Sequence, residues 1–234
     1  HVPHTPPQTL AGKAVQGATG DAHLDMLHEA DIQLGILVDC LKKYGILENT
    51  LIVFTSDNGG LARGKPGNKL LGHNSNAPLR GSKATIWEGG HRVPLIARWG
   101  DGTKTGSTII PGTTSSALVG LQDIFATLAD LTSQTLQAEE GLDSQSFLPA
   151  LLQRDSSELR HGLLVQANDG DGWGQRLAKA FRLDQWKLIA TKDREPIHLF
   201  NLSEDLSEQH DVIENVEQKA RVATMLRDLN SILD

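Results

Sequence analysis

The spacing of apolar residues changes character along the 234-residue chain and predicts its main elements. Between Asp21 and Gly45 apolar residues recur at spacings of three and four, which predicts an amphipathic helix that ends at Gly45. Two short apolar runs follow, at 51–55 and 93–99, and both are rich in β-branched or aliphatic residues. Such runs are typical of strands that are buried on both faces, as in a parallel sheet covered by helices. A second amphipathic helix is predicted from about Ser115.

The pattern changes after about residue 155, where short apolar strands replace the alternation of helix and strand. We expect strands at 163–166, 186–191 and 197–200, separated by turn residues, and these favour a small antiparallel sheet. A final helix carries apolar residues at helical spacing between 216 and 232. The chain is therefore predicted to be α/β, with a core part at 1–155 and a small α+β subdomain at 156–234.

Composition and charge narrow the range of functions. Hydrophobic residues make up 38% of the chain, which is enough for a folded core, and the net charge of −7 argues against nucleic acid as a partner. No apolar run approaches the length of a membrane span, so no membrane-spanning segment is expected. The single cysteine, Cys40, excludes an intrachain disulfide, and its place within the predicted helix favours a packing role.

Asp57 and Asn58 are the first candidates for chemistry, because they stand where the 51–55 strand leaves the sheet. Ligands of open α/β sheets bind at the carboxyl ends of strands. A carboxylate beside an amide oxygen offers two hard ligands that suit Ca²⁺ or Mg²⁺. Gly59 and Gly60 would allow a sharp turn that keeps the site open. The alternative interpretation of these four residues is an ordinary surface turn.

Four segments in order resemble the formylglycine-dependent sulfatases of the alkaline phosphatase superfamily. Residues 48–60 resemble the strand and metal-binding turn of that family, and residues 79–94 resemble its Gly-x-Lys segment with the Glu-Gly-Gly-x-Arg-x-Pro continuation. Residues 1–6 resemble its Pro-His-x-Pro loop. Residues 199–208 resemble its C-terminal strand and Asp-x-x-Glu turn, with Leu206 in place of the usual proline.

The resemblance implies both a fold and a site. The fold would be the latter part of an alkaline-phosphatase-like mixed or parallel sheet flanked by helices, followed by the small antiparallel subdomain. Asp57 and Asn58 would ligate a divalent cation, usually calcium, while Lys83 and His4 would contact the sulfate group as catalytic and substrate-binding residues. Cleavage of a sulfate ester builds charge on the bridging oxygen, which a cation, an ammonium and an imidazolium would stabilise. His4 could also protonate the leaving alkoxide.

The chain departs from the family pattern at the nucleophile. The family makes its formylglycine from Cys or Ser in a Cys/Ser-x-Pro/Ala-x-Arg motif, and that motif does not occur here. The paired aspartates that complete the metal site in the family precede the nucleophile and are also absent. The opening residues, which begin with His1, are typical of the middle of a longer protein. We therefore expect a C-terminal portion that is inactive alone, with the formylglycine in a missing N-terminal half that would act as its partner.

These observations lead to one main functional hypothesis and two alternatives. The main hypothesis is a sulfuric ester hydrolase of the arylsulfatase type, acting on a small sulfate ester or a sulfated glycan. The alternatives are a phosphodiesterase or phosphonate hydrolase of the same superfamily, and a truncated, non-catalytic relative. By analogy with the family, the protein would be periplasmic or secreted. A missing half would also leave an exposed apolar face, and His73 and His91 flank the site as candidate substrate contacts.

Overall fold

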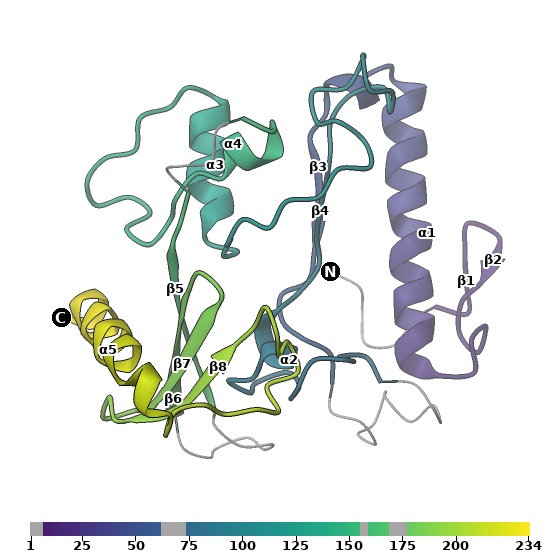
Figure 1. Cartoon of the computed structure of the whole chain (residues 1–234). Helices are drawn as coiled ribbons and strands as arrows, with labels where there is room; N and C mark the ends of the chain where they lie inside the picture. Colours follow the sequence, from purple (N-terminus) through teal and green to yellow (C-terminus); the bar gives the residue numbers. More distant parts are fainter. Residues whose placement is uncertain (1–6, 62–73, 155–158, 169–176) are drawn as a thin grey trace.

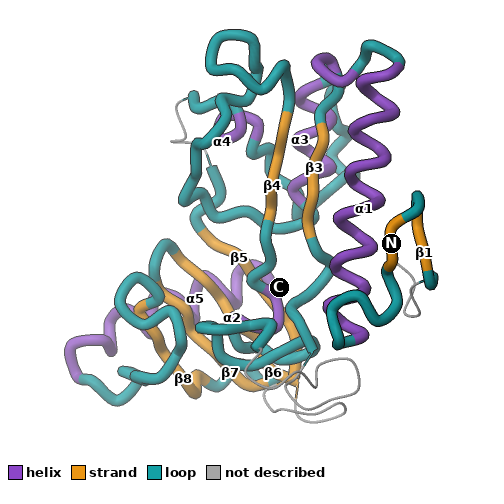
Figure 2. Tube along the Cα trace, turned by 90° about the vertical axis from the view of Figure 1, so that its right-hand side faces the viewer, coloured by secondary structure: helices purple, strands orange, loops and turns teal. Residues whose placement is uncertain are grey.

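A computed structural model of the chain describes residues 7–61, 74–154, 159–168 and 177–234. The long helix α1 (Ala22–Lys43) stands beside an antiparallel pair of strands, β3 (Ile52–Thr55) and β4 (Leu95–Arg98) (Figure 1). The C-terminal residues form a separate four-stranded sheet, and the rotated view keeps these two groups apart (Figure 2). The predicted α/β class and the predicted C-terminal sheet are confirmed.

Helix α1 begins and ends where the sequence predicts. The Asp21 side chain accepts hydrogen bonds from the amides of His23 and Leu24, at 2.9 and 3.3 Å, which satisfies two amides of the first turn. At the other end Gly45 has φ of +67°, a left-handed conformation that glycine adopts without strain. Local capping chemistry therefore sets both ends of the helix.

The buried face of α1 differs from the predicted one. Leu27 and Leu37 of the predicted apolar stripe are 54% and 49% exposed, whereas the helix buries Asp25, Glu29 and Ile32. Asp25 lies under the loop that precedes the helix and accepts hydrogen bonds from the amides of Gly17 and Thr19. Cys40 is exposed, so the packing role expected for it is wrong. Periodicity located the helix but did not show which face is covered.

The strand predicted at 51–55 exists, but its surroundings are not those of a buried parallel strand. In the described residues β3 pairs only with β4, and the pairing is antiparallel. The directly opposed residues Phe54 and Ile96 are 38% and 60% exposed, so one face of the pair is open to solvent. Burial on both faces is therefore wrong for this chain, because a two-stranded pair has no third strand and no cover on that side.

The C-terminal sheet has the order β5-β6-β7-β8 and is antiparallel throughout. Its strands are β5 (Gly162–Asn168), β6 (Leu177–Leu183), β7 (Trp186–Thr191) and β8 (Pro196–Asn201). Helix α5 (Lys219–Leu233) covers one face through Met225 and Leu229. Ile86 and Trp87 cover the other face. Strand β6 was not predicted, because Lys179 and Arg182, three residues apart, interrupt its apolar run.

The helix predicted from Ser115 begins later. Helix α3 runs over Asp123–Leu131, and residues 111–120 form no regular helix. The Asp123 carboxylate accepts a hydrogen bond from the Gly120 amide at 2.8 Å, which closes a turn immediately before the helix. The short helix α4 (Leu148–Leu151) and the hairpin of β1 (Thr9–Leu10) and β2 (Lys13–Ala14) were not predicted.

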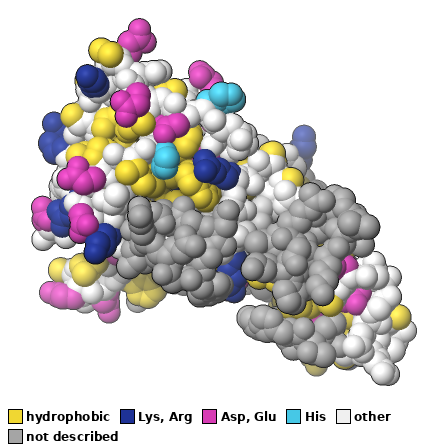
Figure 3. Space-filling view, turned by 90° about the horizontal axis from the view of Figure 1, so that it is seen from below, with side chains coloured by type: hydrophobic (Ala, Val, Ile, Leu, Met, Phe, Trp, Pro, Cys, Tyr) yellow, Lys and Arg dark blue, Asp and Glu magenta, His cyan; other side chains and the backbone are white. Residues whose placement is uncertain are grey.

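The surface combines exposed apolar side chains with interspersed charges. Large exposed apolar residues lie on α1, on the β3–β4 pair and around α3, in agreement with the expected apolar surface; they are Leu27, Ile36, Leu37, Phe54, Ile96, Leu121, Phe125 and Leu128. Seen from below, Lys, Arg, Asp and Glu side chains are interspersed around a group of hydrophobic side chains on the left of the view (Figure 3). Every described helix is too short or too polar to cross a lipid bilayer.

The division of the chain into a core part at 1–155 and a C-terminal subdomain at 156–234 stays a prediction.

Candidate functional site

The turn at 57–60 is held by hydrogen bonds to two other segments. The Gly59 amide donates to the Gly90 carbonyl at 3.0 Å. The Gly60 amide donates to the Asn76 side-chain oxygen at 2.7 Å, and the Asn76 amide group donates back to the Gly60 carbonyl at 3.1 Å. The chain bends at Asp57 and Asn58, directly after β3, and neither Gly59 nor Gly60 has a positive φ, so the bend does not depend on a left-handed glycine. Glycine is favoured at both positions by close neighbours, which are the Gly89 backbone at Gly59 and the Ser75 and Asn76 side chains at Gly60.

Asp57 and Asn58 present oxygen atoms of the kind that calcium prefers. Asp57 is exposed, and no described residue forms a hydrogen bond or ion pair with its carboxylate. The Asn58 amide group donates to the Gly59 carbonyl at 3.0 Å, which fixes the side chain and leaves its carbonyl oxygen to accept. Within the described ranges no cluster of three or more acidic, histidine or cysteine residues could hold a metal. Asp57 and Asn58 are therefore of the right chemical type to ligate a hard cation, and they supply only some of the ligands that such a cation needs.

Lys83 lies next to this turn through its backbone. Its amide donates to the Gly60 carbonyl at 2.9 Å, and its side chain is half-buried. The preceding Ser82 is fixed by a hydrogen bond from its amide to the Thr85 hydroxyl at 3.1 Å. The structure therefore places the Lys83 backbone against the Asp57–Gly60 turn. His4 lies outside the described residues, as does His73.

A buried ion-pair cluster, which we call the Lys187 cluster, lies behind the turn and was not predicted. Lys187 on β7 lies 2.9 Å from Glu88 and 2.8 Å from Glu208, and all three side chains are at most 2% exposed. The second Glu88 oxygen accepts from Arg92 at 3.1 Å. His91 lies 3.2 Å from the Lys187 ammonium. The buried Lys187 and the 41% exposed Arg92 thus balance the two buried carboxylates, because a buried charge needs a partner of opposite sign.

Burial and the neighbouring charges shift the pKa values of this cluster. Burial alone would raise the pKa of Glu88, but the Lys187 charge, the nearby His91 and hydrogen bonds outweigh it and lower the pKa to about 2. Burial, followed by the Lys187 charge, lowers the pKa of His91 to about 4. His91 is therefore neutral at pH 7 and lies against the Lys187 ammonium. The substrate contact considered for it from sequence stays a prediction.

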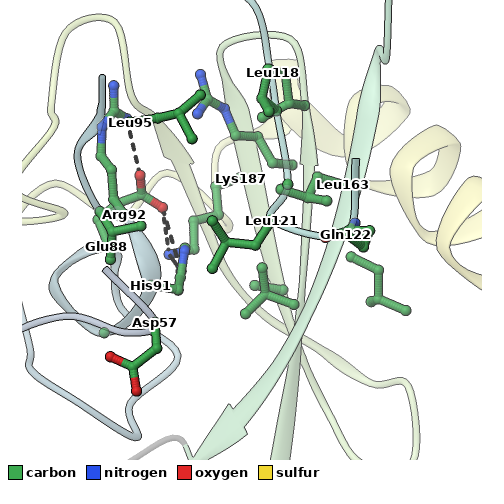
Figure 4. A pocket seen from close by; sticks show the side chains of 18 residues that line it. Asp57, Glu88, His91, Arg92, Leu95, Leu118, Leu121, Gln122, Leu163 and Lys187 are labelled. Carbon is green, nitrogen blue, oxygen red and sulfur yellow. Dashed lines mark hydrogen bonds and ion pairs between the residues drawn. The ribbon is translucent and has the colours of Figure 1, made fainter. Parts of the chain in front are cut away.

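A cavity of about 300 Å³ lies between the Lys187 cluster and the strands (Figure 4). Its polar side is formed by Glu88, His91, Arg92 and Lys187, and Leu118, Leu121 and Leu163 line its apolar side. Asp57 stands at its rim, with the carboxylate directed away from His91 in Figure 4. Neither Asn58 nor Lys83, both described, lines this cavity.

One sequence signal could have revealed the Lys187 cluster. Lys187 is the charged residue within the apolar run 186–190, and a lysine in a covered strand needs a buried acid. Glu88 and Glu208 belong to the two family-like segments at 79–94 and 199–208. That membership would single them out as candidate partners for a buried lysine. Their pairing required the tertiary structure, since 120 residues separate the Glu88 amide from the Glu208 carboxylate that accepts its hydrogen bond.

Comparison with known proteins places this site in a family. A family model described as Sulfatase matches residues 1–134, which include the turn, Lys83 and Glu88. The chain belongs to the sulfatase family. It is 30% identical over 246 residues to an N-acetylgalactosamine-6-O-sulfatase of Bacteroides thetaiotaomicron, a match that covers 100% of this chain and 44% of that protein.

Solved sulfatase-like structures extend the similarity to the fold. A Bacteroides thetaiotaomicron structure described under the metabolism of multiple glycosaminoglycans superposes with a TM-score of 0.80 at 28% identity, and covers 99% of this chain and 48% of that one. The structure of Ps i-CgsB in complex with k-i-k-neocarrahexaose gives a TM-score of 0.72 at 30% identity, with coverage of 90% and 42%. The chain spans about half the length of the relatives it matches, and its fold is alkaline-phosphatase-like, as the resemblance implied.

Proposed function

We propose that this chain supplies the cation-binding and sulfate-binding residues of a sulfuric ester hydrolase. The observation that carries the proposal is the hydrogen bond from the Lys83 amide to the Gly60 carbonyl, at 2.9 Å. It joins the Asp57–Gly60 turn to the segment that carries Lys83, although 23 residues separate Gly60 from Lys83 in the sequence. Shared membership of the sulfatase family supports the same assignment.

Each residue has a separate task in this proposal. Asp57 and Asn58 would hold Ca²⁺ through a carboxylate and an amide oxygen, and Mg²⁺ is the alternative cation. The bound cation would supply charge that stabilises a sulfate oxygen as the ester bond breaks. Lys83 would place a point charge on a second sulfate oxygen. His4 would donate a proton to the departing alkoxide.

The substrate class in this proposal is a sulfate ester, either a small molecule or a sulfated glycan. The relative of known activity is named an N-acetylgalactosamine-6-O-sulfatase, and a structural relative was solved with a neocarrahexaose. Both names point to carbohydrates. Calcium is plentiful outside the cytoplasm, so a periplasmic or secreted protein fits the proposed cation.

The 234 residues contain no Cys/Ser-x-Pro/Ala-x-Arg motif for a formylglycine nucleophile. We therefore propose that the chain alone does not turn over a sulfate ester, and that turnover requires a segment that carries the nucleophile. This separates binding residues, which this chain holds, from the group that attacks sulfur. A phosphonate or phosphodiester hydrolase of the superfamily would use the same cation, so the substrate must be decided by assay.

The test is hydrolysis by the protein expressed from its natural start codon. Aryl sulfate, aryl phosphonate and phosphodiester substrates are compared, and Lys83→Ala is measured against the exposed control Lys42→Ala. We expect sulfate to be preferred and Lys83→Ala to lower kcat by about 100-fold or more, since it removes charge that acts in the transition state. Unchanged kinetics in Lys83→Ala would contradict the role of Lys83, and preference for a phosphorus ester would contradict the reaction.

A further inference from the structure

The Lys187 cluster connects two parts of the chain that are remote in sequence. Lys187 lies in β7, Glu88 begins the short helix α2 (Glu88–His91), and Glu208 lies in the loop after β8. The two Glu208 oxygens are divided between the Lys187 ammonium, at 2.8 Å, and the Glu88 amide, at 2.7 Å. Both carboxylates therefore converge on one buried ammonium, and this joins α2 to the C-terminal sheet. Figure 4 shows the Glu88 side of the cluster, where Glu88, His91 and Lys187 lie together.

A short series of backbone contacts runs from α2 to the proposed site. The Gly90 carbonyl of α2 accepts the hydrogen bond from the Gly59 amide, at 3.0 Å. The Gly89 amide donates to the Arg80 carbonyl at 2.7 Å, three residues before Lys83. A displacement of α2 would therefore move the Asp57–Asn58 turn and the Lys83 segment together.

Packing alone does not fix α2 on its cavity side. The cavity of about 300 Å³ borders Glu88, Gly90 and His91, so one side of this helix has space instead of packed atoms. On the other side Ile86 and Trp87 pack on the sheet, and Arg80 stacks over the Trp87 ring at 3.5 Å. On the cavity side the direction-specific contacts of Glu88 and His91 to Lys187 hold α2 in place, in addition to its backbone hydrogen bonds, because apolar packing is not directional.

We propose that Lys187 is a positioning residue for the cation-binding and sulfate-binding site. It touches neither the cation nor the sulfate. It acts through Glu88 and Gly90, and it fixes the position of the Asp57–Asn58 turn relative to Lys83. This inference rests on the proposed function of that turn, and it adds a requirement that the C-terminal sheet contributes to the site.

The experiment measures amide hydrogen exchange by NMR in this chain and in Lys187→Met, which keeps an unbranched side chain of nearly the same length and removes its charge. Lys192→Met, an exposed position in the turn directly after β7, is the matched control. We expect exchange of the Gly59 and Lys83 amides to rise by about tenfold or more in Lys187→Met. Exchange of Phe181 and Ile189, within the sheet, should rise much less, and Lys192→Met should change none of the four amides.

A purely structural role for Lys187 gives a different result. It would raise exchange equally in the sheet and in the turn, and that outcome overturns the proposal, as does unchanged exchange at Gly59 and Lys83. Glu208→Gln serves if Lys187→Met does not fold, because it removes one charge and keeps an acceptor for the Glu88 amide. The same selective rise, of smaller size, is expected there, and its absence contradicts the proposal.

Kinetics of the protein expressed from its natural start codon separate this inference from the proposed function. If both hold, Lys187→Met lowers kcat and raises the calcium concentration needed for half-maximal activity, while Lys192→Met changes neither. If Lys83→Ala abolishes turnover and Lys187→Met leaves both quantities unchanged, the proposed function stands and the positioning role falls. If Lys187→Met loosens the turn but Lys83→Ala has normal kinetics, the contact series stands and the proposed function falls.

Discussion

The amide nitrogen of Gly59 lies 3.0 Å from the carbonyl oxygen of Gly90, and the two glycine-containing segments meet with no side chain between them. A Cβ placed on Gly59 would lie 1.7 Å from the Gly89 carbonyl oxygen. A Cβ on Gly90 would lie 2.1 Å from the Thr85 carbonyl oxygen. The Glu-Gly-Gly segment and the Asp-Asn-Gly-Gly turn therefore need glycine for the same reason, which is close contact between backbones.

This contact predicts that Gly59→Ala destabilises the chain. The added methyl group forces the turn away from α2, which costs about 1–3 kcal/mol or more of unfolding free energy. Gly35→Ala is the control, because Gly35 is exposed in α1 and its Cβ would meet nothing within 4 Å. In that position alanine should stabilise by up to about 1 kcal/mol. Urea unfolding of both variants measures the difference, and equal midpoints would contradict the contact.

A second prediction concerns Asp123, which is buried at the start of α3. Arg160 binds it from before β5 with nitrogen–oxygen distances of 2.6 and 3.1 Å, and the Gly120 and Gln145 amides also donate to it. Asp123→Ala leaves the guanidinium without its partner and should cost about 3–5 kcal/mol. Asp130→Ala, on the exposed side of the same helix, should cost under about 1 kcal/mol. Thermal unfolding of both variants distinguishes the two positions.

The sequence predicted best what local chemistry determines. The ends of α1 follow from Asp21 and Gly45, and the C-terminal sheet follows from short apolar strands with turns between them. Both depend on residues that are close in the sequence. The predicted turn does follow β3, and its backbone meets that of Lys83, while the roles of these residues stay a prediction.

The sequence could not show which surfaces are covered. An apolar run such as 51–55 predicts a strand, but it does not state whether neighbours are present, and Phe54 is exposed beside Ile96. The Lys187 cluster was missed for a related reason. Its members lie on three distant segments, and a lysine reveals its buried partners only when the segments are brought together.

The third prediction is that His91 makes stability depend on pH. Its pKa falls from 6.5 unfolded to about 4 folded, so the unfolded chain binds the proton first as the pH decreases. The contribution of neutral His91 to the free energy of unfolding is therefore complete above pH 6.5 and is lost as the pH falls toward 4. At about 1.4 kcal/mol per pKa unit, the loss is roughly 3 kcal/mol. Glu88, with a pKa lowered to about 2, acts mainly below this window.

His91→Gln isolates this effect, because glutamine keeps an acceptor near Lys187 and does not titrate. Glu208 opposes the trend, since burial raises its pKa, but it is present in both proteins and cancels in the comparison. Urea unfolding at pH 7 and at pH 4 gives the free energy of unfolding of the parent chain and of His91→Gln at each pH. The parent chain should lose more stability than His91→Gln over this interval, and equal losses would show that His91 is not the titrating group.

The last prediction concerns calcium at the Asp57–Asn58 turn. Calcium in proteins takes roughly six to eight oxygen ligands, and this turn offers one carboxylate and one amide oxygen. The described residues supply no further acidic cluster. Calorimetry of the chain alone should therefore give a Kd weaker than about 1 mM, the weak end of natural calcium sites. The protein expressed from its natural start codon should bind more tightly if a preceding segment completes the ligand set, and in it Asp57→Asn should weaken binding while the exposed control Asp39→Asn should not. Tight binding by the chain alone would point to ligands other than this pair, and tight binding that survives Asp57→Asn would remove Asp57 from the site.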